Sequence, residues 1–295
     1  MRKRSSTPSL VRVGLAGSTM AFVLAACSVS SNVSTTGGPG GDSSVPSLGF
    51  APSNVAAALV GLDLSNLPDI DSTETIDQTG VDCNATPGCI ATTVTQSDGS
   101  VVNLYVAHSW RIEANAVVTI ADSKPLVIVA LTTIDILGRL DASSQGDDPI
   151  AGGIKGVAGM TGGGAGGGLA GQTTDNTPGI GGGGGGFCGA GGAGGNATST
   201  LGAGGASYGS ATLIPLTPGS AGGGAELAGG GSGGAVQLVA GISVTIEAGG
   251  IVAAGGGGGA PGGPYSAGQA AAGGGSGGAV LIEAPSVSVL GTIEV

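Results

Sequence analysis

Few side chains of this sequence could take part in catalysis, and one histidine is the most conspicuous of them. His108 is the only histidine, and it is followed by Ser109 and by Trp110, the only tryptophan. Serine, histidine and aspartate can assemble a nucleophilic triad from distant parts of a chain, so the sequence leaves that arrangement open. His108 lies in a β-like run, however, where an imidazole is ordinarily packed or half-exposed. We therefore expect no catalytic role for it.

Closely spaced carboxylates indicate a second chemistry, the hydrolysis of glycosidic bonds. Asp135, Asp141, Asp147 and Asp148 could supply the pair of carboxyl groups that such a reaction needs. A polysaccharide-degrading enzyme that uses surface carboxylates is therefore the enzymatic alternative. Against it, the chain has only seven aromatic residues for contacts with sugars and few basic residues for binding acidic polymers. We expect no intrinsic catalysis and no cofactor.

An acidic segment between residues 63 and 82 could bind calcium. Asp69, Asp71 and Glu74 have a spacing that could gather several of the oxygen ligands that calcium requires. The glycine and the distal glutamate of an EF-hand loop are missing, however. We favour a solvated acidic loop without a metal site, and a calcium-dependent binding module remains an alternative.

The cysteines indicate a disulfide more readily than a metal site. Cys83 and Cys89 enclose the turn-rich stretch NATPG, and such a pair can form a disulfide in an exported chain. No histidine or third thiolate lies near them in the sequence, which argues against zinc. Cys188 stands apart in a glycine-rich stretch and is left without a predicted partner.

The N-terminal residues have the features of an export signal. A basic start, MRKR, precedes an apolar stretch over residues 13–26 that is too short to span a bilayer. The stretch ends in Leu24-Ala25-Ala26-Cys27, which resembles the lipobox of bacterial lipoproteins. The resemblance implies that the Cys27 thiol is lipidated and that residues 1–26 are removed. Ser28 follows, where an aspartate would imply retention at the inner membrane, so the outer membrane is favoured.

The composition excludes several classes of protein. Glycine accounts for 66 of the 295 residues, and charged residues for 9%. Helices are disfavoured in the C-terminal half because each interior glycine costs a helix about 1 kcal/mol relative to alanine. Beyond Cys27 four basic residues stand against 19 acidic ones, a net charge of −15. Such a chain repels phosphate backbones, so we expect no nucleic-acid partner.

Repeats then organise the rest of the chain. The phrase AGGGSGGAV occurs at residues 228–236 and again at 272–280. A related strand pattern, an apolar pair, an alternating run, a glycine and a short strand, recurs over residues 126–142, 238–253 and 282–295. Recurrent units that cannot bury an apolar face alone are typical of stacked architectures. Alternation predicts that three pairs point inward, Ile134 with Ile136, Val244 with Ile246 and Val287 with Val289, and that Asp135, Thr245 and Ser288 point outward.

We therefore predict an all-β fold, a parallel β-solenoid-like stack of short strands with long glycine-rich loops; a β-sandwich is the alternative. The predicted domains are a lipoprotein signal peptide over residues 1–26, a Ser/Gly/Pro tether over 27–50, an acidic mixed segment over 51–100 and a β-repeat domain over 101–295. Glycine-rich insertions occupy about residues 152–233 and 255–278. These insertions could be disordered, could form loops or could form packed polyglycine II-like helices. We favour partly ordered loops.

The phrases SKPLVIVALTTIDILGRLDAS, GGGGGGFCGAGGAGG and AGGGSGGAVQLVAGISVTI also resemble glycine-rich, repeat-bearing bacterial surface lipoproteins, with a superficial similarity to PGRS-type glycine repeats. The resemblance covers residues 101–295 and implies a location in the cell envelope, lipid-anchored at the outer membrane and surface-exposed. We expect a structural or adhesive protein. Its expected partners are the membrane, through the anchor, and envelope polysaccharide or other surface proteins.

Overall fold

The computed structural model describes residues 20–25, 28–33, 47–73, 76–78, 83, 86–172, 179–262 and 270–295. Cys27 and Glu74, the predicted lipidation site and one of the calcium ligands considered above, lie outside these residues. Within the described part of the chain, no helix has the length and apolarity needed to cross a membrane.

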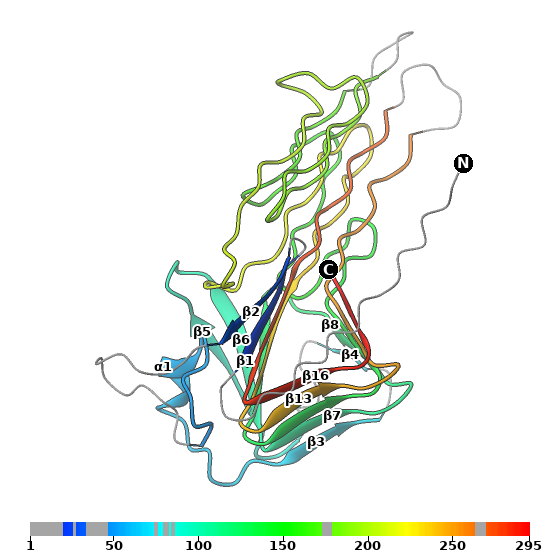
Figure 1. The fold of residues 1–295 in the computed structure, drawn as a ribbon. Helices are drawn as coiled ribbons and strands as arrows, with labels where there is room; N and C mark the ends of the chain where they lie inside the picture. Colours follow the sequence, from blue (N-terminus) through cyan, green and yellow to red (C-terminus); the bar gives the residue numbers. More distant parts are fainter. Residues whose placement is uncertain are drawn as a thin grey trace.

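Three sheets contain nearly all the regular structure of these residues (Figure 1). The first sheet has the order β2-β1-β15-β12-β9-β6-β5, the second β16-β13-β10-β7-β3 and the third β17-β14-β11-β8-β4. Of the described residues only a single turn, α1 (Ala56–Leu59), is an α-helix. The strands are β1 (Met20–Ala25), β2 (Ser28–Val33), β3 (Asp69–Ser72), β4 (Ile76–Gln78), β5 (Ile90–Thr95), β6 (Val101–Ala107), β7 (Ser109–Ile112), β8 (Val117–Ile120), β9 (Leu126–Ala130), β10 (Thr133–Ile136), β11 (Arg139–Asp141), β12 (Ala235–Ala240), β13 (Ser243–Ile246), β14 (Ile251–Ala253), β15 (Ala279–Ala284), β16 (Ser286–Val289) and β17 (Thr292–Glu294).

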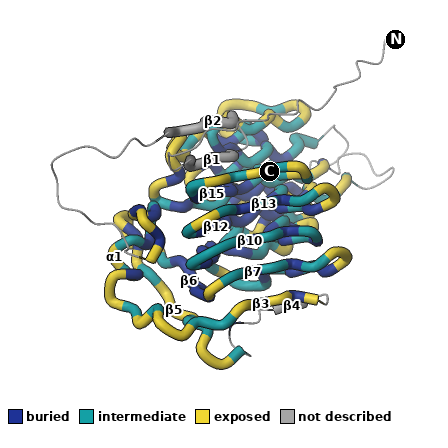
Figure 2. The backbone as a smooth tube through the Cα atoms, turned by 60° about the horizontal axis from the view of Figure 1, so that its bottom comes forward, coloured by how far each residue is buried: buried dark blue, intermediate teal, exposed yellow. Residues whose placement is uncertain are grey.

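Successive triplets of strands supply one strand to each sheet, beginning with β6, β7 and β8 and ending with β15, β16 and β17. Neighbouring triplets pair in parallel and in register, so that Ile134 lies beside Val244 and Val244 beside Val287. Figure 2 shows these strands stacked one above another. The predicted all-β fold of short, mostly parallel strands is confirmed. Among the described strands, the antiparallel pairing expected of a sandwich occurs only in the pairs β1–β2, β1–β15 and β5–β6.

A single apolar core fills the space that the three sheets enclose. In the second and third sheets, buried and half-exposed residues alternate along β7, β8, β10, β11 and β13. Ile134, Ile136, Val244 and Ile246 point into this core, as predicted. In the last triplet Val287 and Val289 belong to the same core but are only partly buried, because no further described strand covers β16.

The glycines that recur between the strands of the second and third sheets lie at corners, where two segments of backbone come too close for a side chain. A Cβ atom on Gly138 would overlap the carbonyl oxygens of Glu113 and Ala116. Gly250 occupies the equivalent corner one triplet later, where a Cβ would overlap the carbonyl oxygen of Ile136. Each corner therefore packs directly on the corner of the preceding triplet, which only glycine permits.

The first sheet is buried on both faces, unlike the other two. Every residue of β9, β12 and β15 is buried, as is typical of parallel strands covered on both sides. Its outer face is covered by residues 47–67, which include α1, and by side chains from the first glycine-rich insertion. The covering side chains include Leu48, Phe50, Val55, Leu59, Phe187, Leu213 and Leu216.

The glycine-rich insertions form a bundle of extended segments that rises from the sheets (Figure 1, green to orange). The amide groups of residues 181–186 donate hydrogen bonds to three neighbouring segments in rotation. Gly181 and Gly184 donate to Gly195 and Gly192, Gly182 and Gly185 to Ala271 and Gly274, and Gly183 and Gly186 to Leu169 and Gly166. Every third amide group thus reaches the same neighbour. The described segments are therefore more regularly ordered than the partly ordered loops that we predicted.

The same period of three recurs in other segments of the bundle. The amides of Ala272, Gly275 and Gly278 donate to the carbonyl groups of Ala260, Gly257 and Ala254. A strand directs its groups with a period of two, and an α-helix bonds internally, whereas a polyproline II-type helix has three residues per turn and no internal bonds. The periodicity therefore identifies the described segments as packed helices of the polyglycine II kind.

Close packing of backbones explains why glycine is required in the bundle. A Cβ atom on Gly183 would overlap the carbonyl group of Ala203, and one on Gly223 would overlap that of Leu169. The φ angles of residues 181–186 lie outside the left-handed region, so close approach, and not an unusual backbone conformation, dictates the residue type there. The interior of the bundle is thus built from peptide groups and not from side chains.

Candidate functional site

The structure brings His108 and Ser109 to an aspartate, but without the geometry of a catalytic triad. Because β3 pairs in register with β7, Asp69 lies beside Ser109. Its Oδ1 atom is 2.7 Å from His108 Nδ1 and accepts a hydrogen bond of 2.5 Å from Ser109 Oγ. A triad serine donates to the imidazole, whereas this one donates to the carboxylate. Hydrogen bonds from Ser109 and then His108 lower the pKa of Asp69, so the carboxylate is a surface acceptor for both groups.

Trp110 follows these polar residues in the chain and has a structural role. Its ring is buried in the core, and Nε1 donates a 3.2 Å hydrogen bond to the carbonyl oxygen of Val129. His108 and Asp69, in contrast, have 49% and 64% of their side-chain surface exposed. Trp110 therefore belongs to the core, whereas His108 and Asp69 lie on the open surface.

The four aspartates considered for glycoside hydrolysis do not lie in one group. Asp135 lies on β10 of the second sheet, and Asp141 on β11 of the third. Asp147 and Asp148 both form ion pairs with Lys155, at 3.5 and 2.7 Å. The sequence placed the four residues close along the chain, but the corner between the two sheets separates Asp135 from Asp141.

Asp141 is held in the ionised form. It accepts a 2.9 Å hydrogen bond from Arg139 Nε and another from the backbone amide of Ser143. Burial acts to raise the pKa of Asp141, but the hydrogen bonds from Arg139 and Ser143 outweigh it, and the pKa is lowered. A glycosidase requires a general acid with a raised pKa, and Asp141 is shifted in the opposite direction.

The acidic segment does not gather a set of metal ligands in the described part of the chain. Asp69 and Asp71 alternate with buried residues along β3 and point outward, and Asp69 is engaged by His108 and Ser109. Among the described side chains, no group of three or more His, Cys, Asp or Glu is placed to hold a metal ion.

The three cysteines of the body lie in two different places. Cys83 and Cys89 are joined in a disulfide with a Cα–Cα distance of 5.1 Å, and Cys83 is buried in the core. Cys188 is a free thiol, half-buried, in the first glycine-rich insertion. It packs against the cluster on the outer face of the first sheet, so its environment is a packed surface between the bundle and the sheet.

A buried carboxylate that sequence reasoning missed lies on that outer face. Glu283 is only 6% exposed and accepts hydrogen bonds from the backbone amide and hydroxyl of Ser53 and, at 2.6 Å, from Gln237 Nε2. Burial raises the pKa of Glu283 against the opposing effect of these hydrogen bonds. The one available signal was a lone acidic residue in the apolar run AVLIEA. The contacts join residues 51–55 to β12 and β15, and they leave the carboxylate enclosed.

Both AGGGSGGAV phrases contain the spacing GxSxG, which occurs in some hydrolases at a nucleophilic serine. Here each serine is part of the glycine bundle. Ser232 Oγ accepts a 2.8 Å hydrogen bond from the amide of Ile154, and Ser276 Oγ accepts one from the amide of Ser220. Neither has the strand-to-helix turn that this motif requires, and the chain's one histidine, His108, is bonded to Asp69.

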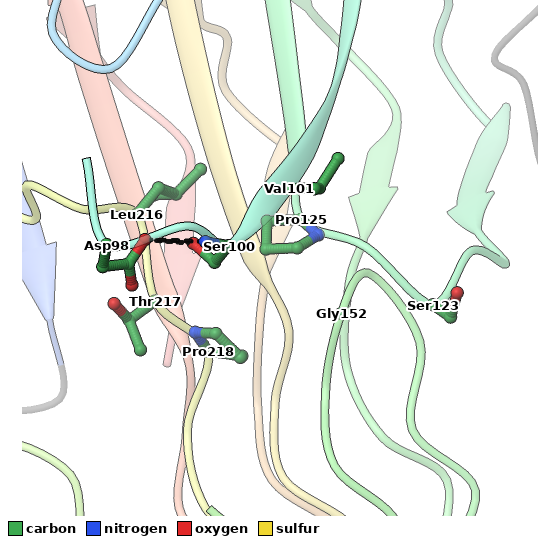
Figure 3. Close-up of a pocket in the computed structure, with 9 residues that line it drawn as sticks. All are labelled: Asp98, Ser100, Val101, Ser123, Pro125, Gly152, Leu216, Thr217 and Pro218. Carbon is green, nitrogen blue, oxygen red and sulfur yellow. Dashed lines mark hydrogen bonds between the residues drawn. The ribbon is translucent and has the colours of Figure 1, made fainter. Parts of the chain in front are cut away.

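A pocket of about 230 Å³ is the remaining candidate site among the described residues (Figure 3). It lies between the turn that joins β5 to β6, the start of β9 and residues 216–218 of the first insertion. Asp98 and Ser100 lie at one end with Thr217, and Ser123 lies at the other. The full lining is Asp98, Ser100, Val101, Ser123, Pro125, Gly152, Leu216, Thr217 and Pro218. Sequence reasoning missed this pocket, because its walls come from four separate segments of the chain between residues 98 and 218.

Comparison with known proteins finds no family model, no curated protein and no solved structure that matches this chain.

Proposed function

We propose that this chain is a lipid-anchored protein of the bacterial cell surface, with a structural or adhesive role and no intrinsic catalysis. The observation that carries the proposal is the hydrogen-bonded glycine bundle seated on stacked sheets. Amides of residues 230–235 donate both to other glycine segments and to residues 142–154, which follow β11 directly. The body is thus an extended framework in which backbone packing predominates, suited to hold a surface away from the membrane.

The three sheets support a more specific architecture, a three-sided parallel β-solenoid. Each triplet supplies one strand to each sheet, and Leu126, Val236 and Val280 stack in register along the first sheet. The corner glycines recur at matching places, as described above. In such a stack each turn of chain covers the apolar side chains of its neighbour, which accounts for the repeated strand pattern.

The anchor rests on the lipobox resemblance at Leu24-Ala25-Ala26-Cys27. Two or more acyl chains on one residue give stable membrane attachment, whereas a single chain gives only marginal binding. Cleavage before Cys27 would also remove β1, which pairs with β15 in this structure. The proposal therefore implies that the edge of β15 has a different neighbour, or none, in the processed protein.

A labelling experiment tests the anchor. We expect the full-length chain, expressed in a bacterial host, to incorporate radioactive palmitate and to sediment with outer membranes. The Cys27→Ala variant should lose both the label and the membrane association, and Cys188→Ala, which retains Cys27, is the matched control. Label that persists in Cys27→Ala, or is lost in Cys188→Ala, would show that the lipobox interpretation is wrong.

An activity assay separates the adhesive proposal from the enzymatic alternative. We expect the purified protein to release no new reducing ends from a panel of neutral and acidic polysaccharides. Release of reducing ends that disappears in both Asp135→Ala and Asp141→Ala would overturn the non-enzymatic proposal.

A further inference from the structure

The pocket of Figure 3 has one wall that is fixed before any ligand arrives. Gln96 is 7% exposed, and its side-chain amide pairs with the backbone of Leu216 through two hydrogen bonds. Gln96 Oε1 accepts from the Leu216 amide at 2.7 Å, and Nε2 donates to the Leu216 carbonyl at 3.1 Å. This pairing docks residues 216–218 against the turn between β5 and β6.

The opposite wall is equally constrained. The carbonyl oxygen of Pro125 accepts a hydrogen bond from the amide of Asn103, and the amide of Gly152 donates to Asp122. Gly152 has a φ of +77°, and a Cβ atom there would overlap the Pro125 ring. Because both walls are already ordered, a ligand that binds here does not have to offset the conformational entropy lost in ordering them.

The lining combines apolar walls with a polar rim. The hydrocarbon surfaces of Val101, Pro125, Leu216 and Pro218 form the walls, and Asp98, Ser100, Ser123 and Thr217 supply oxygen atoms. Mostly apolar walls with a few placed polar groups are the usual composition of a small-molecule site. Sites for drug-sized ligands have volumes of about 300–1,000 Å³, so this pocket suits a single ring. A pyranose ring has the matching chemistry, with C–H faces and a periphery of hydroxyl groups.

The charge of the pocket selects among sugars. Hydrogen bonds from the Ser100 hydroxyl and then the Ser100 amide lower the pKa of Asp98, so this carboxylate is ionised at neutral pH. No lysine or arginine of the described residues forms an ion pair with it. An uronic acid would bring a second negative charge beside Asp98, whereas a neutral hexose offers hydroxyl donors to it.

We propose that this pocket binds one neutral hexose residue of a polysaccharide, with Asp98 as the acceptor for its hydroxyl groups. The inference rests on the proposed adhesive function and identifies its ligand class. The hydroxyl groups of Ser100, Ser123 and Thr217 already donate within the protein, so their oxygen atoms serve as further acceptors for the hydroxyl groups of the ring. The apolar walls pack against its C–H faces.

Binding by the full-length chain to two immobilised polymers tests the proposal: mannan as the neutral glycan and polygalacturonate as the uronate. We expect mannan to bind best. Asp98→Ala removes the charged acceptor and Ser123→Tyr fills the opening, so each should weaken mannan binding about tenfold or more.

Asp63→Ala is the matched control. Asp63 Oδ1 accepts hydrogen bonds from Ser65 N and Oγ at 3.1 and 2.7 Å, and Asp98 Oδ1 accepts the same pair from Ser100 at 3.0 and 2.6 Å. Both substitutions remove the same local turn, but only Asp98 lines the pocket, so Asp63→Ala should bind mannan like the wild type. Equal thermal midpoints of the two alanine variants would show that folding is not the cause of any difference.

Three results would overturn the pocket assignment. These are mannan binding that survives in both pocket variants, stronger binding to polygalacturonate than to mannan, and no binding to either polymer. The first result would exclude this pocket as the binding site but would not contradict the proposed adhesive function. In the other two cases the Cys27→Ala labelling experiment judges the surface anchor independently.

Discussion

At the scale of single residues, the described carboxylates divide by environment. Exposed or half-buried aspartates such as Asp69, Asp98 and Asp141 are held ionised by hydrogen-bond donors, and their pKa values are lowered. Glu283 differs because its enclosure under residues 51–55 raises its pKa despite three donors. A carboxylic acid with a raised pKa often marks a catalytic acid, but here it lies in a closed contact between a covering segment and a sheet.

Replacing Glu283 should therefore change how stability depends on pH. A raised folded-state pKa means that Glu283 contributes most stability when protonated, below its unfolded pKa, and that this contribution is lost as pH rises through the folded pKa. We expect the unfolding free energy of the wild type, relative to Glu283→Gln, to fall as pH rises from 4 to 8. Denaturant unfolding of both proteins at several pH values measures this difference.

The exposed Glu226 provides the control for this series. Glu226→Gln makes the same chemical change at an exposed position and is measured over the same pH series. A wild-type stability relative to Glu283→Gln that is constant, or that rises with pH, would contradict the effect assigned to burial.

At the scale of elements, two kinds of packing meet along the first sheet. The sheets are held by apolar side chains, for which Ile246 and Leu238 are fully buried examples. The bundle is held by peptide hydrogen bonds between glycine segments, where a side chain would separate the backbones. Its contribution to stability depends on every segment being in place, because the central amides donate hydrogen bonds to three separate segments.

Alanine substitutions in the bundle should therefore differ sharply by position. A methyl group on Gly183 would overlap the backbone of Ala203, whereas one on Gly192 would meet no atom within 4 Å. We expect Gly183→Ala to destabilise the protein by about 1–3 kcal/mol, the usual cost of overpacking. Gly192→Ala should be neutral or stabilise it by up to about 1 kcal/mol, because alanine restricts the unfolded chain. Denaturant unfolding of the two variants measures both effects, and equal destabilisation would argue against close packing at Gly183.

At the scale of the whole molecule, the sequence predicted those features that repeat. The inward positions Ile134 and Val244 follow from alternation, and the corner glycines follow from their place between strands. The cover over the first sheet, the Glu283 contacts and the pocket could not be predicted, because each joins segments far apart that share no pattern. The pairing of Gln96 with Leu216 across 120 residues is an example. Glycine composition alone does not distinguish disorder, loops and packed helices, because these states differ in their hydrogen-bond partners and not in composition.

The most direct test of this account is amide hydrogen exchange across the glycine-rich insertions of the full-length protein. In a packed polyglycine II-type bundle every successive amide of residues 181–186 is hydrogen-bonded to a neighbour. We therefore expect all of these amides to exchange slowly, with protection comparable to that of β9 and β12. Exchange of residues 181–186 at the rate of an unfolded chain, while β9 and β12 stay protected, would contradict the bundle and with it the proposed framework.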